Sequence, residues 1–369
     1  MISDFNRNLC NIIGKKTKKI IVIESDDWGS IRMPSIHAFD LMNKKGIDFS
    51  GESFRYNKFD TLASIQDFVS LYETLSLFHD IQGNKPNFTA ISVVANPDFN
   101  KIRDSGFSEY YYEPFTKTLE RYYDTSNSFP MWLEGIRQKL FVPQFHGREH
   151  LNVYVWMNAL RENNQEARFA FDQGCWGFNN KHRFGISYQA AFDIEHIDQL
   201  VQQTEIIKDG LNLFEKIFGY RAKYFVPPNG PFNNKLEEIS KNNGISFMSN
   251  SKIQYEPLGN GKKQIVLHYF GQKNKYNQYY ITRNCFFEPN KPGKDWVDSC
   301  LNEISIAFRW HKPAVISSHR VNYIGVHYQY NRDNSLQQLK RLLNNILKKW
   351  PDVEFMTSDA LGELIAKSR

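Results

Sequence analysis

The segment that decides the fold lies near the start of the chain, where residues 20–29 read IIVIESDDWG. Four aliphatic residues in a row are typical of a buried strand in a parallel sheet. An acidic cluster follows at once, formed by Glu24, Asp26 and Asp27. In a barrel of parallel strands, side chains at the carboxyl ends of the strands surround the active site. Adjacent acidic residues also cap turns, so this cluster alone leaves both catalysis and capping open.

Short apolar runs alternate with longer stretches of helical periodicity along the chain, which is typical of βα units. The expected strands are 20–24, 88–94, 140–145, 224–226, 245–248, 265–269, 279–282, 314–317 and 353–356. The clearest expected helices are 65–78, 191–218, 235–242, 296–310 and 335–349. Two of these helices end at stop signals, Asn243-Gly244 and Trp350-Pro351. This order favours an α/β fold built as a closed or nearly closed parallel barrel.

The composition is that of an ordinary globular protein. Of 369 residues, 41% are hydrophobic and 23% are charged, which is enough to build a core. The net charge of +6 is spread along the chain without a basic stripe or a binding motif, so we expect no nucleic-acid partner. No linker or repeat marks a second domain, so residues 1–369 are expected to form a single domain. We interpret the aromatic segment at about 151–187 as an elaborated loop over the barrel mouth.

Cysteine content and hydropathy indicate the expected location. The four cysteines, Cys10, Cys175, Cys285 and Cys300, lack CxxC spacing, so we expect reduced thiols. The first residues show no secretory signal. No later stretch approaches the roughly 20 apolar residues that a membrane span requires. We therefore expect a cytoplasmic protein without a membrane span, and the sequence leaves its oligomeric state open.

A second polar cluster, His146-Gly147-Arg148-Glu149-His150, follows the expected strand 140–145. Histidines at positions i and i+4 lie on one face of a helical turn and can bind the same metal ion. A single buried histidine is more often structural than ligating. Together with Asp27, however, this pair supplies two nitrogens and one oxygen and leaves coordination positions for water and substrate. That donor set is typical of a catalytic metal site and not of a closed structural one.

Four segments, in this order, resemble the motifs of the polysaccharide deacetylases, also called NodB-homology proteins or carbohydrate esterase family 4. They read Ser25-Asp26-Asp27-Trp28-Gly29, His146 to His150, Phe225-Val226-Pro227-Pro228-Asn229-Gly230 and Val315-Ile316-Ser317-Ser318-His319-Arg320. The resemblance implies a distorted (β/α) barrel of the NodB/glycoside hydrolase-deacetylase type. It also implies that Asp27, His146 and His150 hold one divalent metal ion, with zinc favoured. It further implies that Asp26 is the catalytic base and that His319 protonates the leaving group.

The sequence departs from the family pattern in two motifs. Where the family commonly has the Arg that orients the base, this chain has Val226, and the candidates to replace that guanidinium are Arg148, Arg283 and Arg320. In addition, Arg320 stands where the family commonly has Asp. The residues expected to contact substrate are Trp28, Arg148, Pro228, Asn229, Arg320 and Asn322. Arg and Asn side chains at the mouth could recognise an acidic group on a sugar, or they could be solvated rim residues.

The expected function is therefore metal-dependent removal of an N- or O-acetyl group from a carbohydrate substrate. The extra Arg residues would allow this substrate to carry an acidic group. The aromatic share of 15% is weak support for a sugar ligand, because aromatic residues also fill cores. One alternative keeps the metal and the barrel but cleaves another amide or a glycosidic bond. The other alternative, motivated by Val226, is a sugar-binding pseudoenzyme that has lost turnover.

Overall fold

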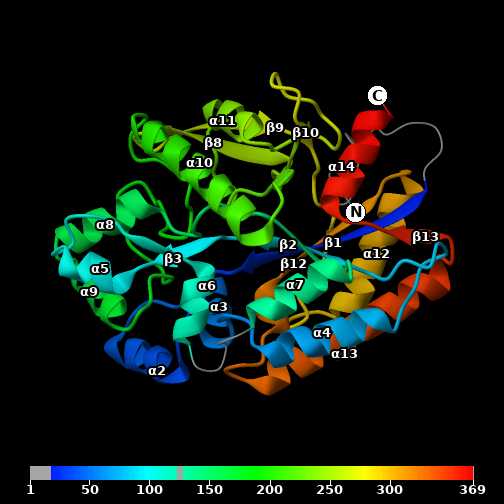
Figure 1. The fold of residues 1–369 in the computed structure, drawn as a ribbon, viewed down its shortest axis with the longest axis horizontal. Coiled ribbons are helices and arrows are strands. Elements are labelled where there is room, and N and C mark those ends of the chain that lie inside the picture. The colour runs from blue at the N-terminus through cyan, green and yellow to red at the C-terminus, as the bar shows by residue number, and fades with distance from the viewer. Residues whose placement is uncertain (1–17, 123–127, 369) are drawn as a thin grey trace.

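A computed structural model describes residues 18–122 and 128–368 of the chain. Its main feature is a parallel sheet of nine strands (Figure 1). These strands are β1 (Lys19–Trp28), β2 (Phe88–Ser92), β5 (Phe141–Phe145), β6 (Tyr224–Phe225), β7 (Phe247–Met248), β10 (Tyr279–Tyr280), β11 (Cys285–Phe286), β12 (Ala314–His319) and β13 (Val353–Phe355). The path of hydrogen-bonded neighbours is β10-β7-β6-β5-β2-β1-β12-β11, and β13 pairs with β1. The ends of this path, β10 and β11, have no ladder between them among the described residues, so the barrel is open and distorted. The expected α/β class and barrel are confirmed.

Strand β1 lies at the centre of the sheet. It pairs with β12 from Ile21 opposite Ala314 to Asp26 opposite His319, with β2 near its end and with β13 near its start. All of its residues after Lys19 are buried. The register therefore places the acidic end of β1 beside the histidine at the end of β12.

Helices cover the sheet on both sides. They are α2 (Ile36–Lys45), α3 (Glu52–Phe59), α4 (Ile65–Ser76), α5 (Phe99–Asp104), α6 (Phe115–Arg121), α7 (Phe129–Arg137), α8 (Val153–Arg161), α9 (Gln165–Asp172), α10 (Gln199–Phe218), α11 (Glu237–Asn242), α12 (Trp296–Arg309), α13 (Gln329–Lys349) and α14 (Ser358–Lys367). Figure 1 shows α4, α7 and α13 below the strands and α10 and α11 above them. The expected stop signals are confirmed, because α11 ends at Asn242 and α13 ends at Lys349.

Three sequence expectations were wrong in detail. The apolar run 265–269 is not part of the barrel sheet. Within residues 18–122 and 128–368, β9 (Lys262–Leu267) pairs only with β8 (Ile253–Gly259), in a separate antiparallel hairpin. The helix expected at 191–218 begins only at Gln199, after a series of turns. The third difference concerns the segment 151–187, which was expected to be an elaborated loop and instead contains two helices.

Segment 151–187 contains the helices α8 and α9. Together with α2 and α5 they form an apolar cluster separate from the barrel core, with Phe39, Phe99, Trp156 and Phe171 buried in it. The aromatic residues of this segment therefore form a core of their own. The many aromatic residues of this segment make the helical spacing of its hydrophobic residues hard to recognise from the sequence.

The described cysteines are consistent with the expected reduced state. Cys175, Cys285 and Cys300 are buried, and none of these three described cysteines forms a disulfide bond. Cys10 lies outside the described residues, as does the first part of the lysine-rich stretch that precedes β1.

Gly29 follows β1 and offers a test of this arrangement. Its φ is +83°, and a Cβ atom there would lie 2.4 Å from the carbonyl oxygen of Val93. We expect Gly29→Ala to lower the free energy of unfolding by about 3 kcal/mol, through strain plus a backbone clash. Urea denaturation measures this loss.

Gly83 is the matched control, because its φ is +80° and a Cβ atom there would meet nothing within 4 Å. Gly83→Ala should lower the free energy of unfolding by only about 1 kcal/mol, because it adds backbone strain without a clash. Equal losses in the two variants would contradict the close contact at Gly29.

Candidate active site

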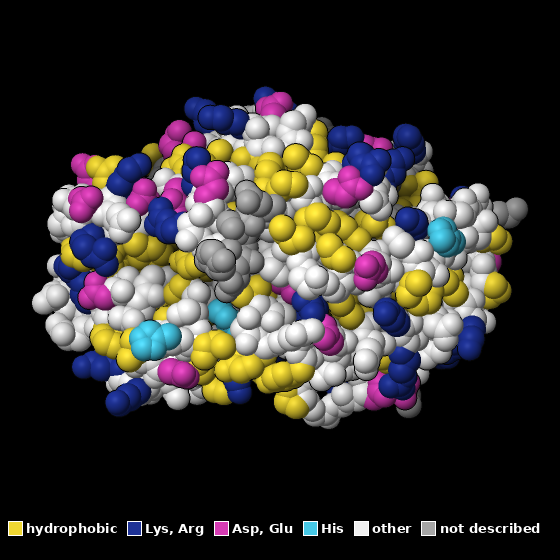
Figure 2. Space-filling view, turned by 60° about the horizontal axis from the view of Figure 1, so that its bottom comes forward, with side chains coloured by type: hydrophobic (Ala, Val, Ile, Leu, Met, Phe, Trp, Pro, Cys, Tyr) yellow, Lys and Arg dark blue, Asp and Glu magenta, His cyan; other side chains and the backbone are white. Residues whose placement is uncertain are grey.

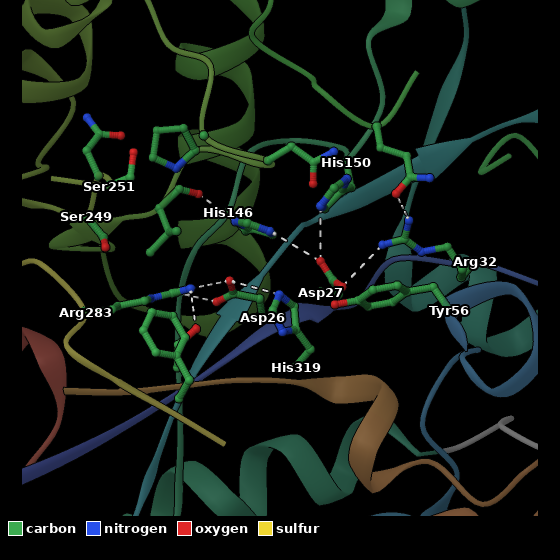
Figure 3. A pocket seen from close by; sticks show the side chains of 18 of the residues that line it. Asp26, Asp27, Arg32, Tyr56, His146, His150, Ser249, Ser251, Arg283 and His319 are labelled. Atoms are coloured by element: carbon green, nitrogen blue, oxygen red, sulfur yellow. Dashed lines mark hydrogen bonds and ion pairs between the residues drawn. The ribbon is translucent and has the colours of Figure 1, made fainter. Parts of the chain in front are cut away.

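The end of β1 has an unusual backbone conformation. Asp27 has a φ of +74°, a region that residues with side chains seldom adopt, although Asp tolerates it better than most. The amide of Val93 donates a hydrogen bond to the carbonyl of Trp28 at 2.9 Å and fixes the turn. As a result the carboxylates of Asp26 and Asp27 both face one cavity (Figure 3). Strained conformations of this kind persist where the surrounding structure holds them, often at functional sites.

The cavity has a volume of about 470 Å³ and lies at the carboxyl ends of the central strands. Its walls come from the ends of β1 and β12, from the segments after β1, β5, β6, β7 and β10, and from α3 and β11. This is the edge at which parallel barrels place their active sites.

Asp27, His146 and His150 meet at one point of the cavity wall. Their potential ligand atoms all lie within 4.8 Å of one another, and all three side chains are buried. Asp27 Oδ1 lies 3.1 Å from His150 Nε2 and 3.5 Å from His146 Nε2. Figure 3 shows both imidazoles directed at this carboxylate.

The hydrogen-bonding pattern of this group fits a cation. His146 Nδ1 lies 2.6 Å from the carbonyl oxygen of Val226, to which it can only donate. In the neutral imidazole, Nε2 is then an acceptor that faces the acceptor Oδ1 of Asp27. Two acceptors repel each other unless a positive charge lies between them. Two nitrogens and one carboxylate oxygen are donors that suit zinc and similar transition metals.

Protonation states at this group also suit a metal. Burial lowers the pKa of His150 to about 4, although the neighbouring Asp27 opposes this shift. Burial raises the pKa of Asp27, but the electrostatic effects of His150 and of the Arg32 guanidinium outweigh burial and hold this pKa well below its usual range. Near neutral pH, His150 is therefore neutral and Asp27 is ionised. These are the states that metal binding requires.

Arg283 orients the other carboxylate of the pair. Its two terminal nitrogens donate to Asp26 Oδ1 and Oδ2, each at 2.6 Å, and its Nε donates to Glu24 Oε2. Glu24 is fully buried and also accepts hydrogen bonds from Tyr224 and Ser358, each at 2.6 Å. Burial raises the pKa of Asp26, but the charge and hydrogen bonds of Arg283 outweigh burial, so the net shift is downward. Asp26 is thus held ionised in a fixed orientation.

His319 lies on the opposite side of Asp26. Its Nδ1 bonds Glu288 Oε1, and its Nε2 lies 3.9 Å from Asp26 Oδ2. Arg55 and Asn322 donate to the second oxygen of Glu288 at 2.8 Å and 2.9 Å. Burial lowers the pKa of His319, but the charge of Glu288 and its hydrogen bond outweigh burial and raise the pKa to about 9. His319 therefore carries a proton near neutral pH.

The structure brings together the expected catalytic and metal-binding residues and separates several residues expected at the substrate. Asn229 lines the cavity, whereas Trp28 packs in the core against Phe68 and Phe141. Pro228 is not among the lining residues, although Pro227 is.

The charged residues expected at the substrate are paired within the protein. Arg148 donates to Glu149 and Asp209 outside the cavity. Arg320 makes a two-point contact with Asp60, with both distances 2.9 Å, and is fully buried. Asn322 is also fully buried and donates to Glu288. Of the three candidates to replace the family Arg, only Arg283 reaches Asp26.

Sequence reasoning missed several cavity residues. Arg32 donates to Asp27 Oδ2 at 3.3 Å and to Gln189, and its guanidinium lies 5.1 Å from the centre of the Tyr56 ring. Tyr56 lines the cavity from α3, and residues 249–252 line it from the segment after β7. Arg32 follows the acidic motif closely enough to be suspected, but no sequence signal connects Tyr56 or residues 249–252 to this site.

Comparison with known proteins gives likeness of fold only. No protein-family model matches the chain, and no curated protein sequence matches it. Among solved structures, a protein from Mycobacterium smegmatis assigned as a polysaccharide deacetylase is 9% identical, with a TM-score of 0.46 and coverage of 97% of this chain and 94% of that one. A 4-alpha-glucanotransferase from Thermococcus litoralis is 10% identical, with a TM-score of 0.45 and coverage of 94% and 40%. The allantoinase PuuE is 11% identical, with a TM-score of 0.44 and coverage of 96% and 91%. Likenesses of this strength say nothing about the reaction of this chain.

The outer surface adds two observations. Figure 2 shows basic and acidic side chains interspersed over the visible face, without a basic stripe. Among the described helices, none is long and apolar enough to cross a membrane.

The Glu288–His319 pair predicts a histidine with a high pKa. In metal-free protein, the NMR titration of the His319 ring should have a midpoint near pH 9. Glu288→Gln removes the negative charge that stabilises the imidazolium, so the midpoint should move to lower pH. Spectra of His319→Ala assign the signal.

Glu52→Gln is the matched control, since Glu52 contacts Arg55 and Lys291 instead of the imidazole. It should leave the His319 midpoint in place. An unchanged midpoint in Glu288→Gln would show that Glu288 does not hold the proton on His319.

Proposed function

We propose that this protein is a metal-dependent hydrolase that removes an N- or O-acetyl group from a saccharide, with zinc as the metal. The observation that carries the proposal is the meeting, in one cavity, of a buried Asp-His-His group, an ionised carboxylate and a protonated histidine. A metal group flanked by a base and an acid is the arrangement that hydrolysis of an acyl bond needs. The single domain and the cytoplasmic location expected from the sequence stay predictions.

The metal group, the base and the acid have separate roles in this reaction. A divalent ion held by Asp27, His146 and His150 would polarise the acyl carbonyl and lower the pKa of a water molecule. Asp26 accepts the proton of the attacking water on a carboxylate oxygen that Arg283 holds in place. Because Nδ1 of His319 bonds Glu288, its Nε2 faces the substrate and donates a proton to the departing amine or hydroxyl.

Arg283 bears on the pseudoenzyme alternative. That alternative was motivated by the missing Arg at position 226, but Asp26 still receives a two-point guanidinium contact, from Arg283. The replacement supports retained turnover. Cleavage of another amide or of a glycosidic bond stays the competing hydrolase reaction, and product analysis separates it from deacetylation.

Metal content and acetate release test the proposal together. Purified protein should bind about one equivalent of zinc. His150→Ala should lose both the metal and acetate release from acetylated oligosaccharides. Asp26→Asn should keep the metal, because Asp26 is not among the three ligands, and lose at least about 100-fold in turnover.

His182→Ala is the matched control, since this half-buried histidine lies in a different pocket and should leave both readouts unchanged. Release of reducing sugar without acetate would instead favour glycosidic cleavage. Binding of acetylated sugars without any product would favour the pseudoenzyme.

Arg283→Lys tests the replacement of the family Arg. Lysine keeps a positive charge beside Glu24 and Asp26 but loses the planar two-point contact. We expect turnover to fall about 100-fold while metal content is unchanged, because only the base is disoriented. Arg341→Lys, at a half-exposed ion pair with Asp295 and Asp298, is the control. Wild-type turnover in Arg283→Lys would exclude an orienting role.

A further inference from the structure

The β8–β9 hairpin presents an apolar face to solvent. The strand register places Ile253 opposite Leu267 and Tyr255 opposite Ile265. These four side chains, which we call the hairpin face, are 52%, 67%, 55% and 60% exposed in that order. Exposed apolar clusters of this kind mark interaction sites in soluble proteins.

The fold fixes the direction of this face. On the inner side of the hairpin, Gln254 donates to the carbonyl of Phe232, and Glu256 accepts a hydrogen bond from the amide of Asn234 at 2.9 Å. Both inner side chains are buried. Because the inner side is tied to the barrel, the outer side chains are held in solvent. Figure 1 shows the hairpin at the edge of the molecule, beside the loop that leads to β10.

The hairpin face lies within a lysine-rich part of the chain. Residues 252–276 include five lysines and one acidic residue, Glu256, which is buried. Lys262 and Lys263 follow the hairpin tip, and Lys273 and Lys275 lie on the next loop, all four exposed. Of these, Lys263 is partly neutralised by Asp193 at 3.8 Å, and Lys275 interacts electrostatically with Glu237 and Glu238. A symmetric dimer through this face would bring like charges together, which disfavours a second copy of the chain as the occupant.

The hairpin face begins in the sequence directly after residues that line the cavity. Ser251 and Lys252 line the cavity, and the first residue of the hairpin face, Ile253, follows directly. An occupant of the face therefore lies beside the entrance to the site.

We propose that the hairpin face docks onto the surface of a membrane that contains anionic lipids. The Ile and Leu side chains enter the acyl boundary, Tyr255 lies at the headgroup level, and the surrounding lysines meet lipid phosphates. Docking would bring the cavity mouth to substrates held at a membrane surface. The inference goes beyond the proposed hydrolase function and does not depend on it.

Vesicle sedimentation of the full-length protein tests this proposal. The protein should pellet with vesicles of phosphatidylcholine and phosphatidylglycerol in equal parts, more weakly with phosphatidylcholine alone, and less as salt is raised. Ile265→Asn/Leu267→Asn should reduce the partition coefficient more than about tenfold. Lys262→Gln and Lys273→Gln should each reduce it about fivefold.

Leu77→Asn/Ile81→Asn is the matched control, because these residues are 63% and 61% exposed on a different part of the surface. It should pellet as the wild type does. The proposal is overturned if the wild type pellets with neither vesicle, if both vesicles bind it equally, or if the control loses binding as well. Light scattering that shows a dimer, abolished by Ile265→Asn/Leu267→Asn without vesicle binding, would assign the face to self-association instead.

Discussion

The structure depends on the burial of three carboxylates at the end of one strand. Glu24, Asp26 and Asp27 are at most 5% exposed, and a buried charge without a partner is strongly unfavourable. Arg283 bridges the first two, and Arg32 contacts the third from the side away from the imidazoles. The arrangement of side chains around the cavity follows from this need for positive charge, and the position left beside Asp27 is the one that a metal ion fits.

Asp26 receives its guanidinium from a different part of the chain than in the family pattern. Arg283 lies in the segment that joins β10 to β11, and only β12 separates β11 from β1 in the sheet. From this segment Arg283 reaches Asp26 directly. Position 226 still serves the site through its backbone, since its carbonyl accepts the hydrogen bond from His146. That contact does not depend on the side chain, which leaves the residue type at 226 free to change.

Several polar residues near the cavity act on other protein groups. Arg320 is neutralised by Asp60, and Asn322 helps to hold Glu288 against His319. These residues stiffen the walls of the cavity, and binding of substrate is left to the cavity lining. Precise catalytic geometry depends on such supporting contacts, because the side chains that line a catalytic cavity need fixed rotamers.

The βα order, the importance of the acidic strand end and the residues able to bind a metal could all be predicted from the sequence, because hydrophobic periodicity and motif spacing are local properties. The hairpin at 265–269 and the helices with their own core at 151–187 could not, because pairing partners and packing are properties of the whole chain. Three arginines were candidates to contact Asp26, and the sequence could not choose among them, since 257 residues separate Asp26 from Arg283. The folded chain places Arg283 at Asp26 and leaves Arg148 and Arg320 to neutralise other carboxylates, because a buried charge needs an opposite charge beside it.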